Sequence, residues 1–207
     1  MPKAISKYIW WIVGVVVLVL LLISPKLFPQ RVAQTVDDPS ALPGLQEGDV
    51  PWTAEISQLS QRLRAIGLPA LSQEGVALHI HQHIDVYVDG KPVSVSGGIG
   101  INQGANYISD IHTHDNSSVI HVESPTRQTF TLGQFFDVWG VKFTKDSLGG
   151  YVASGDKSLK VYSNGKLYDG DPRTLPLEQH QEIVVTYGTD QELPNPIPSS
   201  FSFSANL

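Results

Sequence analysis

The sequence predicts an α+β protein: a single N-terminal transmembrane helix followed by one extracytoplasmic domain. Three observations lead to this prediction. A long apolar run lies near the N-terminus, residues 76–88 alternate between apolar and polar side chains, and a helix-capping pattern near residue 131 precedes a strong hairpin turn. We divide the chain into a cytoplasmic N-terminus and anchor (1–28), a linker (29–51), an extracytoplasmic domain (52–189) and a flexible tail (190–207).

Residues 8–28 are predicted to anchor the chain in a membrane. The run from 8 to 23 is unbroken, and with the residues that follow it is long enough for a bilayer core of ~30 Å. Trp10 and Trp11 suit the membrane interface, while Lys3 and Lys7 favour a cytoplasmic N-terminus. A cleavable signal peptide is the alternative, but its apolar core is usually about 7–15 residues and ends at a small-x-small site. The longer run without such a site favours an uncleaved single-pass anchor.

The charge of the chain argues against nucleic-acid binding. All 20 acidic residues follow position 36, and from Thr35 onward 10 basic residues face these 20 acidic ones, a formal charge of −10. Nucleic acid requires a basic footprint, which this domain lacks. The chain also has no cysteine, which excludes disulfides, thiolate ligands and lipoprotein attachment.

The domain is expected to begin with an amphipathic helix. Residues 29–51 hold several prolines and little periodicity, as is typical of a tether. Over residues 52–67, Ile56, Leu59, Leu63 and Ile66 recur at helical spacing, and Gly67 follows as a stop signal. The apolar face of this helix is expected to pack on the domain.

Strands and turns are predicted along the rest of the domain. Residues 76–88 form a strand, and Asp89-Gly90 is a hairpin turn signal that returns residues 91–101 beside it. Residues 108–114 and 118–123 form a second hairpin. The capping pattern Thr131-x-x-Gln134 opens a short helix that ends at Gly140. Residues 160–163 and 166–168 flank Asn164-Gly165, residues 182–187 form the last strand, and the proline-rich tail from 190 is expected to be flexible.

This order of elements resembles a β-grasp, the ubiquitin-like layout. The resemblance lies in residues 159–167, Leu177 and the strand at 182–185, which are similar to the closing half of small β-grasp carrier proteins. It implies that the hairpin at 108–123 is inserted between the first strands and the helix. The sequence ends Ser204-Ala-Asn-Leu207 and does not show the terminal Gly-Gly of those carriers, so sulfur-carrier or conjugation chemistry is not implied.

Six of the seven histidines lie in two tight clusters. They are His79, His81 and His83 in the first, and His112, His114 and His121 in the second. Together with the motifs His112-Thr-His-Asp115, His121-Val-Glu123 and residues 129–140, they resemble a family of uncharacterised, membrane-anchored bacterial proteins. That resemblance implies one extracytoplasmic domain in which the histidines act as a unit.

The spacing of these histidines predicts a metal site. Residues at i and i+2 of a strand point to the same face, about 6.6 Å apart, so two imidazoles can converge on one ion. His79 and His83 would lie about 13 Å apart and cannot easily share an ion. We therefore expect His81 and one neighbour to meet His112 and His114, with His121 a further ligand or part of a second site.

Three acidic residues are expected to orient the imidazoles without binding the ion: Asp85, Asp115 and Glu123. Imidazole ligands suit Zn(II), Cu(II), Ni(II) or Fe(II), and we expect zinc or copper(II). Copper(I) prefers sulfur, and the only methionine is Met1.

Three functions follow as alternatives. The first is metal capture, sensing or delivery at the outer face of the membrane, with an unknown protein partner. The second is a metal-dependent hydrolase or oxygenase that uses the same residues, for example a facial triad of His112, His114 and Glu123. The third is a metal-free interaction module, in which the histidines are ordinary surface or core residues or sense pH. His180, in a polar loop, is expected to be solvent-exposed.

Overall fold

A computed structural model describes residues 39–205 and residue 207 of the chain. The predicted membrane anchor and the first part of the predicted linker lie outside these residues. Among the residues that the structure describes, no helix is long and apolar enough to span a membrane. The described chain is a mixed α+β domain, dominated by β-sheet, with two α-helices.

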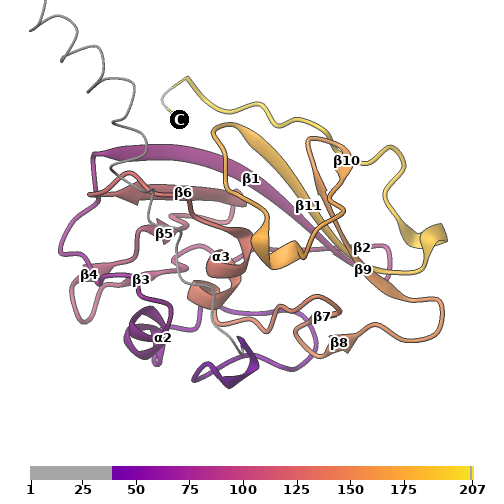
Figure 1. The fold of residues 1–207 in the computed structure, drawn as a ribbon, viewed down its shortest axis with the longest axis horizontal. Coiled ribbons are helices and arrows are strands. Elements are labelled where there is room, and N and C mark those ends of the chain that lie inside the picture. Colours follow the sequence, from indigo (N-terminus) through magenta and orange to yellow (C-terminus); the bar gives the residue numbers. More distant parts are fainter. Residues whose placement is uncertain (1–38, 206) are drawn as a thin grey trace, which may run out of the picture. The chain divides into compact units, whose positions relative to one another are not determined.

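The domain is built on one seven-stranded sheet in which the first and last long strands lie side by side. Its strands are β1 (Leu78–Val88), β2 (Lys91–Val93), β5 (Ile111–His112), β6 (Val119–Ser124), β9 (Ser158–Ser163), β10 (Lys166–Leu167) and β11 (Gln181–Gly188). The order is β10-β9-β11-β1-β6-β5, with β2 also paired to β1. β1 and β11 run parallel through the middle of the sheet (Figure 1).

Antiparallel hairpins extend the sheet on both sides of this central pair. β9 and β10 are joined by Asn164-Gly165, which the sequence predicted as a turn, and both turn residues have positive φ. On the other side, β6 pairs with the first half of β1 and β2 with its second half. Only residues 91–93 of the predicted return strand pair with β1. Beyond them, β3 (Ile101–Asn102) pairs with β4 (Tyr107–Ile108) in a small separate hairpin.

Helix α3 (Leu132–Trp139) forms the centre of the hydrophobic core. Thr131 caps it in a reciprocal capping box with Gln134, and Gly140 ends it in the left-handed conformation, as the sequence predicted. Every residue of α3 is buried. Helix α2 (Leu59–Ala65) contacts α3 but is shorter than predicted, because it begins only at Leu59 and leaves Ile56 exposed.

The remaining elements are short. They are the 3-10 helices η1 (Pro39–Ala41), η2 (Pro172–Thr174) and η3 (Asp190–Glu192) and the hairpin of β7 (Ser147–Leu148) and β8 (Tyr151–Val152).

Two segments differ from the predicted domain boundaries. Residues 42–51, predicted as part of a linker, pack on the domain: Leu42 is buried and the Gln46 backbone pairs with Val141. In the tail predicted to be flexible, the Phe201 ring stacks on His83, with ring centroids 3.9 Å apart. The sequence did not predict these contacts, because a proline-rich segment carries no hydrophobic period.

Candidate metal centre

Three histidines form a row across neighbouring strands. His81 on β1 is paired directly with His121 on β6, and His121 is paired directly with His112 on β5. Side chains at directly paired positions point to the same face of a sheet. The His81 and His121 rings are 4.6 Å apart between centroids, and the His121 and His112 rings 5.4 Å. Strand register therefore brings together histidines that are 40 residues apart in sequence.

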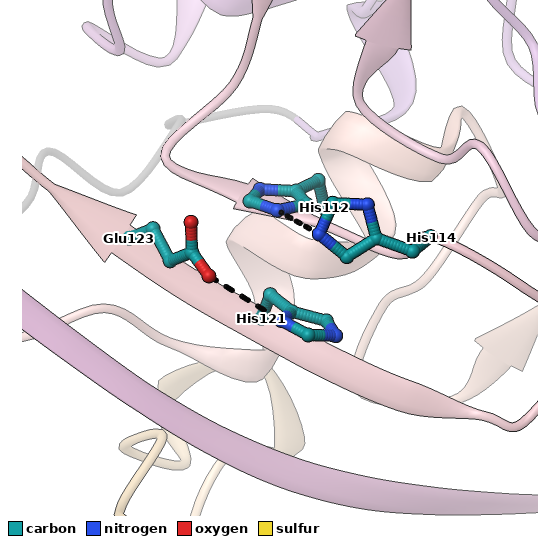
Figure 2. A group of neighbouring side chains, drawn as sticks. All are labelled: His112, His114, His121 and Glu123. Carbon is teal, nitrogen blue, oxygen red and sulfur yellow. Dashed lines mark hydrogen bonds and ion pairs between the residues drawn. The ribbon is translucent and has the colours of Figure 1, made fainter. Parts of the chain in front are cut away.

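The i, i+2 neighbours extend this row on the same face. His79 lies beside His81, with 3.1 Å between the two Nε2 atoms. His114 lies beside His112, with 3.3 Å between their Nε2 atoms (Figure 2). Five of the six clustered histidines thus lie close together on the sheet, in a cluster that we call the histidine face: His79, His81, His112, His114 and His121.

A glycine-rich loop holds the His112–His114 segment in place. Thr113 accepts a hydrogen bond from the Ile99 amide through its hydroxyl, and its own carbonyl accepts one from the Gly98 amide. A Cβ on Gly100 would lie 2.5 Å from the Ile111 carbonyl oxygen, so only glycine permits this close approach. Because Thr113 is bound to the loop, the histidines on either side of it point toward the histidine face.

His112 is already oriented as a metal ligand. Its Nδ1 lies 3.0 Å from the Ser109 carbonyl oxygen, to which it donates a hydrogen bond. This bond fixes the tautomer and leaves the lone pair on Nε2, which faces His114. A backbone carbonyl that binds the far nitrogen is the arrangement found around most metal-bound histidines.

Glu123 connects the histidines of β1 to those of β5 and β6. It was expected to orient the imidazoles or, in the alternative facial triad, to bind the ion itself. Its Oε1 lies 3.1 Å from His79 Nε2 and 3.4 Å from His121 Nδ1. Two groups of possible ligands therefore share this carboxylate, and within each group all the ligand atoms lie within 4.8 Å of one another. One consists of His112, His114, His121 and Glu123 (Figure 2), and the other of His79, His81 and Glu123.

His83 belongs to a third, separate group. Its Nδ1 lies 2.9 Å from Glu182 Oε2, and Asp85 completes the set. This agrees with the straight-strand argument that His79 and His83 cannot share an ion. The structure places Asp85 here, where it could bind an ion directly.

Burial favours the neutral form of three central histidines. It lowers the pKa of His112 to about 3, with the nearby His114 adding to the effect, and lowers the pKa of His81 and His121 to about 4. Burial and the neighbouring Glu74 carboxylate raise the pKa of Glu123 to about 7. Neutral imidazoles keep their lone pairs free at neutral pH, which is the state that binds a metal ion.

The histidine face is buried at its centre and open at its rim. His81 and His112 are buried, whereas the side chains of His79 and His114 are 54% and 44% exposed. Among the described residues, His81 Nδ1 and His121 Nδ1 are buried without a hydrogen-bond partner. Buried polar atoms usually have partners, so unpartnered ones indicate a missing ligand. These histidine and glutamate groups can hold a metal ion that enters at the rim.

Some site residues were missed or misplaced by sequence reasoning. Asp115 is exposed and accepts a hydrogen bond from the Ser117 amide, outside all three groups. Glu74 lies 3.5 Å from His114, and Glu182 joins His83, yet neither was predicted. Glu182 lies on the last strand, and only the parallel pairing of β1 with β11 brings it opposite His83.

Comparisons with known proteins assign no family to this arrangement. No protein-family model matches the chain, and neither the curated proteins nor the solved structures include a significant match. Fold and site therefore define the class by themselves: an α+β domain with a face of clustered histidines that could hold a metal ion.

Proposed function

We propose that this protein is a membrane-tethered, extracytoplasmic metal-binding protein that captures, senses or delivers Zn(II) or Cu(II). The observation that carries the proposal is the row His81–His121–His112, set in register across three strands. Among the described residues, His81 Nδ1 and His121 Nδ1 in this row are buried without a hydrogen-bond partner. A histidine row that served only packing would have its nitrogens hydrogen-bonded to protein groups.

The donor set supports the choice of metal. The two connected groups offer imidazole nitrogens and one carboxylate, and cysteine is absent from the chain. Such nitrogen-rich sites suit zinc and copper(II) better than calcium or magnesium, which prefer oxygen. The formal charge of −10 beyond residue 34 favours cations near the domain.

Two structural statements belong to the same proposal. We propose residues 8–28 as a single-pass anchor, with the N-terminus in the cytoplasm, on the strength of the apolar run and of Lys3 and Lys7. We also propose a β-grasp-like domain with an inserted hairpin. Support comes from the central parallel pair β1–β11, the hairpins that flank it, and α3 between β6 and β9 in the chain.

Metal analysis of the purified full-length chain tests the proposal. The protein should carry zinc or copper, or bind one of them after chelator treatment, as measured by elemental analysis. The double variant His112→Ala/His114→Ala should lose the metal that these two histidines help to hold. The matched control is His180→Ala, which removes an exposed histidine outside the three groups. Full metal retention in the double variant would contradict the ligand assignment.

A metal-dependent hydrolase or oxygenase is the second candidate. His79, His81 and Glu123 form a two-histidine, one-carboxylate set, which leaves coordination positions open for substrate. Glu74, beside His114, also lines a surface cavity of about 310 Å³ together with Asn102 and Tyr107. Metal-dependent turnover that is lost in Glu74→Gln, with metal content unchanged, would favour this candidate over metal capture.

The third reading, a metal-free interaction module, requires histidines scattered over different faces. Five of the six instead share the histidine face, so this reading has the weakest support.

A further inference from the structure

We infer that the histidine face holds two metal ions rather than one, bridged by the Glu123 carboxylate. This inference rests on the proposed metal-binding function and goes beyond it in the number and arrangement of the ions. It assigns one ion to His112, His114 and His121, and the other to His79 and His81.

The distances on the histidine face fit two adjacent coordination shells. In a tetrahedral shell with metal–nitrogen distances of ~2.0–2.1 Å, two ligand atoms lie about 3.3 Å apart. The Nε2 atoms of His79 and His81 are 3.1 Å apart, and those of His112 and His114 are 3.3 Å apart. Each pair therefore already has the separation of one edge of such a shell.

Glu123 supplies the corner that the two shells would share. A single oxygen, Oε1, lies 3.1 Å from His79 Nε2 and 3.4 Å from His121 Nδ1. Both separations again match the edge of a tetrahedral shell. One four-coordinate ion can use only four donors, and the two groups together present five nitrogens and this carboxylate. A single ion would thus leave part of the donor set unused.

The electrostatics of the face also favour a bridge at this position. Two divalent cations at the ~3.5–4 Å separation of known two-metal sites repel each other strongly unless an anion lies between them. The Glu123 side chain is 6% exposed, so water screens little of this repulsion and the carboxylate must offset it. Glu74, 3.5 Å from His114, adds a second negative charge at the rim.

Neighbouring imidazoles accommodate the Glu123 carboxylate when no metal is bound. Its cross-strand partner is His79, and His121 precedes it by two residues on the same face of β6. Both imidazoles lie within 3.4 Å of the carboxylate. Metal binding would replace these weak contacts by coordination bonds, with little movement of the strands.

Copper(II) titration of the full-length, chelator-treated chain tests the inference. We expect two ions bound on the histidine face and a magnetically coupled signal in electron paramagnetic resonance, with a spin count below one per bound copper. An ion at His83, Asp85 and Glu182 would be isolated and would contribute a full, uncoupled spin. Coupling therefore identifies the bridged pair whatever that group binds.

Variants of the histidine ligands test each of the two proposed metal ions separately. His79→Ala/His81→Ala and His112→Ala/His114→Ala should each leave one uncoupled ion, and the isosteric Glu123→Gln should abolish the coupling. Asp115→Asn, which changes an exposed carboxylate outside the groups, is the matched control. Wild-type protein that binds one ion, or two uncoupled ions, overturns the inference and leaves the proposed function intact. Wild-type protein that binds neither copper(II) nor, in a parallel titration, zinc overturns the proposed function itself. The wild-type signal decides the case even if a variant fails to fold.

Discussion

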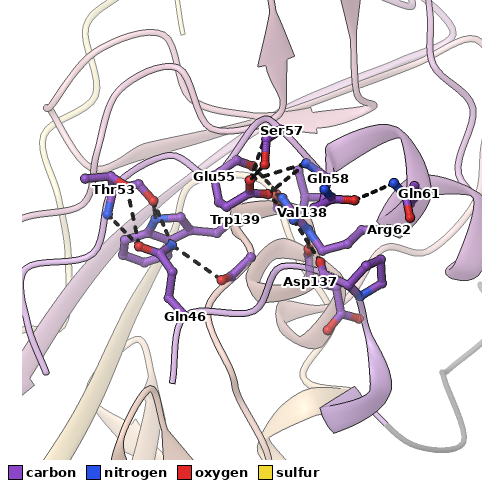
Figure 3. A network of polar contacts seen from close by, with 12 residues as sticks. Gln46, Thr53, Glu55, Ser57, Gln58, Gln61, Arg62, Asp137, Val138 and Trp139 are labelled. Atoms are coloured by element: carbon purple, nitrogen blue, oxygen red, sulfur yellow. Dashed lines mark hydrogen bonds and ion pairs between the residues drawn. The ribbon is translucent and has the colours of Figure 1, made fainter. Parts of the chain in front are cut away.

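Two of the buried polar clusters in the domain are built on opposite principles. The first surrounds Arg62, which is 0% exposed (Figure 3). Its Nε donates to the Asp137 carbonyl, its Nη1 to Pro43 and to the Glu55 carboxylate, and its Nη2 to the Glu55 and Val138 carbonyls. These contacts satisfy all five donors that a guanidinium possesses. The second cluster, the histidine face, leaves His81 Nδ1 and His121 Nδ1 unpartnered among the described residues.

This difference separates a structural cluster from a functional one. The Arg62 network joins the start of the domain, helix α2 and the end of helix α3, and it is complete without any other molecule. The nearby Trp139 side chain also has its hydrogen bond satisfied, because the indole N–H donates to the Thr53 carbonyl. Strand register also fixes the positions of the residues of the histidine face. Unlike the Arg62 network, this face has ring nitrogens without a hydrogen-bond partner among the described residues. Removing one side chain of the first cluster should therefore lower the stability of the protein, whereas binding of a metal to the second cluster should raise it.

The largest expected effect is on the Arg62 network. Arg62→Met keeps the apolar part of the side chain, but it removes the ion pair with Glu55 and the guanidinium hydrogen bonds to several carbonyls. We expect the free energy of unfolding to fall by about 3–5 kcal/mol, as for other broken buried ion pairs. Urea unfolding followed by circular dichroism measures this loss. Arg64→Met, on the exposed side of the same helix, is the control and should change stability by less than about 0.5 kcal/mol.

Metal should stabilise the protein through the histidine face alone. At a free zinc or copper concentration of 100 times Kd, binding to the folded state adds about 2.7 kcal/mol. Thermal unfolding with and without metal should show this gain in the wild type and in Arg64→Met. His112→Ala/His114→Ala should show a smaller gain, because only the ion at His79 and His81 remains. An equal metal-induced gain in that double variant would mean that the ion binds elsewhere.

The metal-free protein should lose stability on acidification between about pH 6.5 and pH 4. Because burial depresses the pKa values of His81, His112 and His121 to about 3–4, the unfolded chain binds protons in this window and the folded chain does not. The raised pKa of Glu123 works in the opposite direction between about 4.5 and 7, so it offsets part of the loss. The chain thus takes up protons on balance when it unfolds, so lowering the pH in this window favours the unfolded state.

Urea midpoints at pH 7.5 and pH 5 measure this dependence. Each pKa unit corresponds to about 1.4 kcal/mol of differential stability, and three histidines outweigh one glutamate. His112→Gln removes the most strongly shifted imidazole and should reduce the difference between the two pH values. A stability that rises on acidification would show that the histidine face is not buried as described.

Local rules made much of this fold predictable. The capping box at Thr131, the Gly140 stop and the Asn164-Gly165 turn each depend on neighbouring residues, and the structure contains all three. The alternation of residues 78–88 also placed His79, His81 and His83 on one face of β1. By contrast, helix α2 was predicted too long, because Ile56 fits a helical period that the chain enters only at Leu59.

The candidate site depended on pairings that no local pattern reveals. The spacing predicted that His81 meets His112 and His114, whereas the structure groups His81 with His79, and Glu123 was expected mainly to orient the imidazoles. Only the register of β1 with β6, which sets Glu123 opposite His79, shows that its oxygen reaches two groups. Glu182 was missed for the same reason, since β11 is about 100 residues from β1 in sequence. Long-range register, rather than residue type, decides which polar groups meet.

The smallest expected effect concerns His83, whose group is intermediate between the two clusters. Its Nδ1 is paired with Glu182 Oε2, but Glu182 Oε1 is buried without a hydrogen-bond partner among the described residues. The Phe201 ring stacks on His83 with an interplanar angle of 3°. Because a stacked aromatic pair contributes about 0.5–1.5 kcal/mol, Phe201→Ala should release the tail locally and lower global stability by no more than about 1 kcal/mol.

Limited proteolysis should detect this release as faster cleavage after Glu192, while the rest of the domain stays resistant. Phe203→Ala is the matched control, since Phe203 stacks less closely, with 4.8 Å between ring centroids, on the exposed His180. Cleavage at the wild-type rate in Phe201→Ala would mean that other contacts hold the tail. If zinc slows cleavage in the wild type but not in His83→Ala, the His83 group also binds metal and belongs with the histidine face. If zinc has no effect, the group is complete without metal and resembles the Arg62 network.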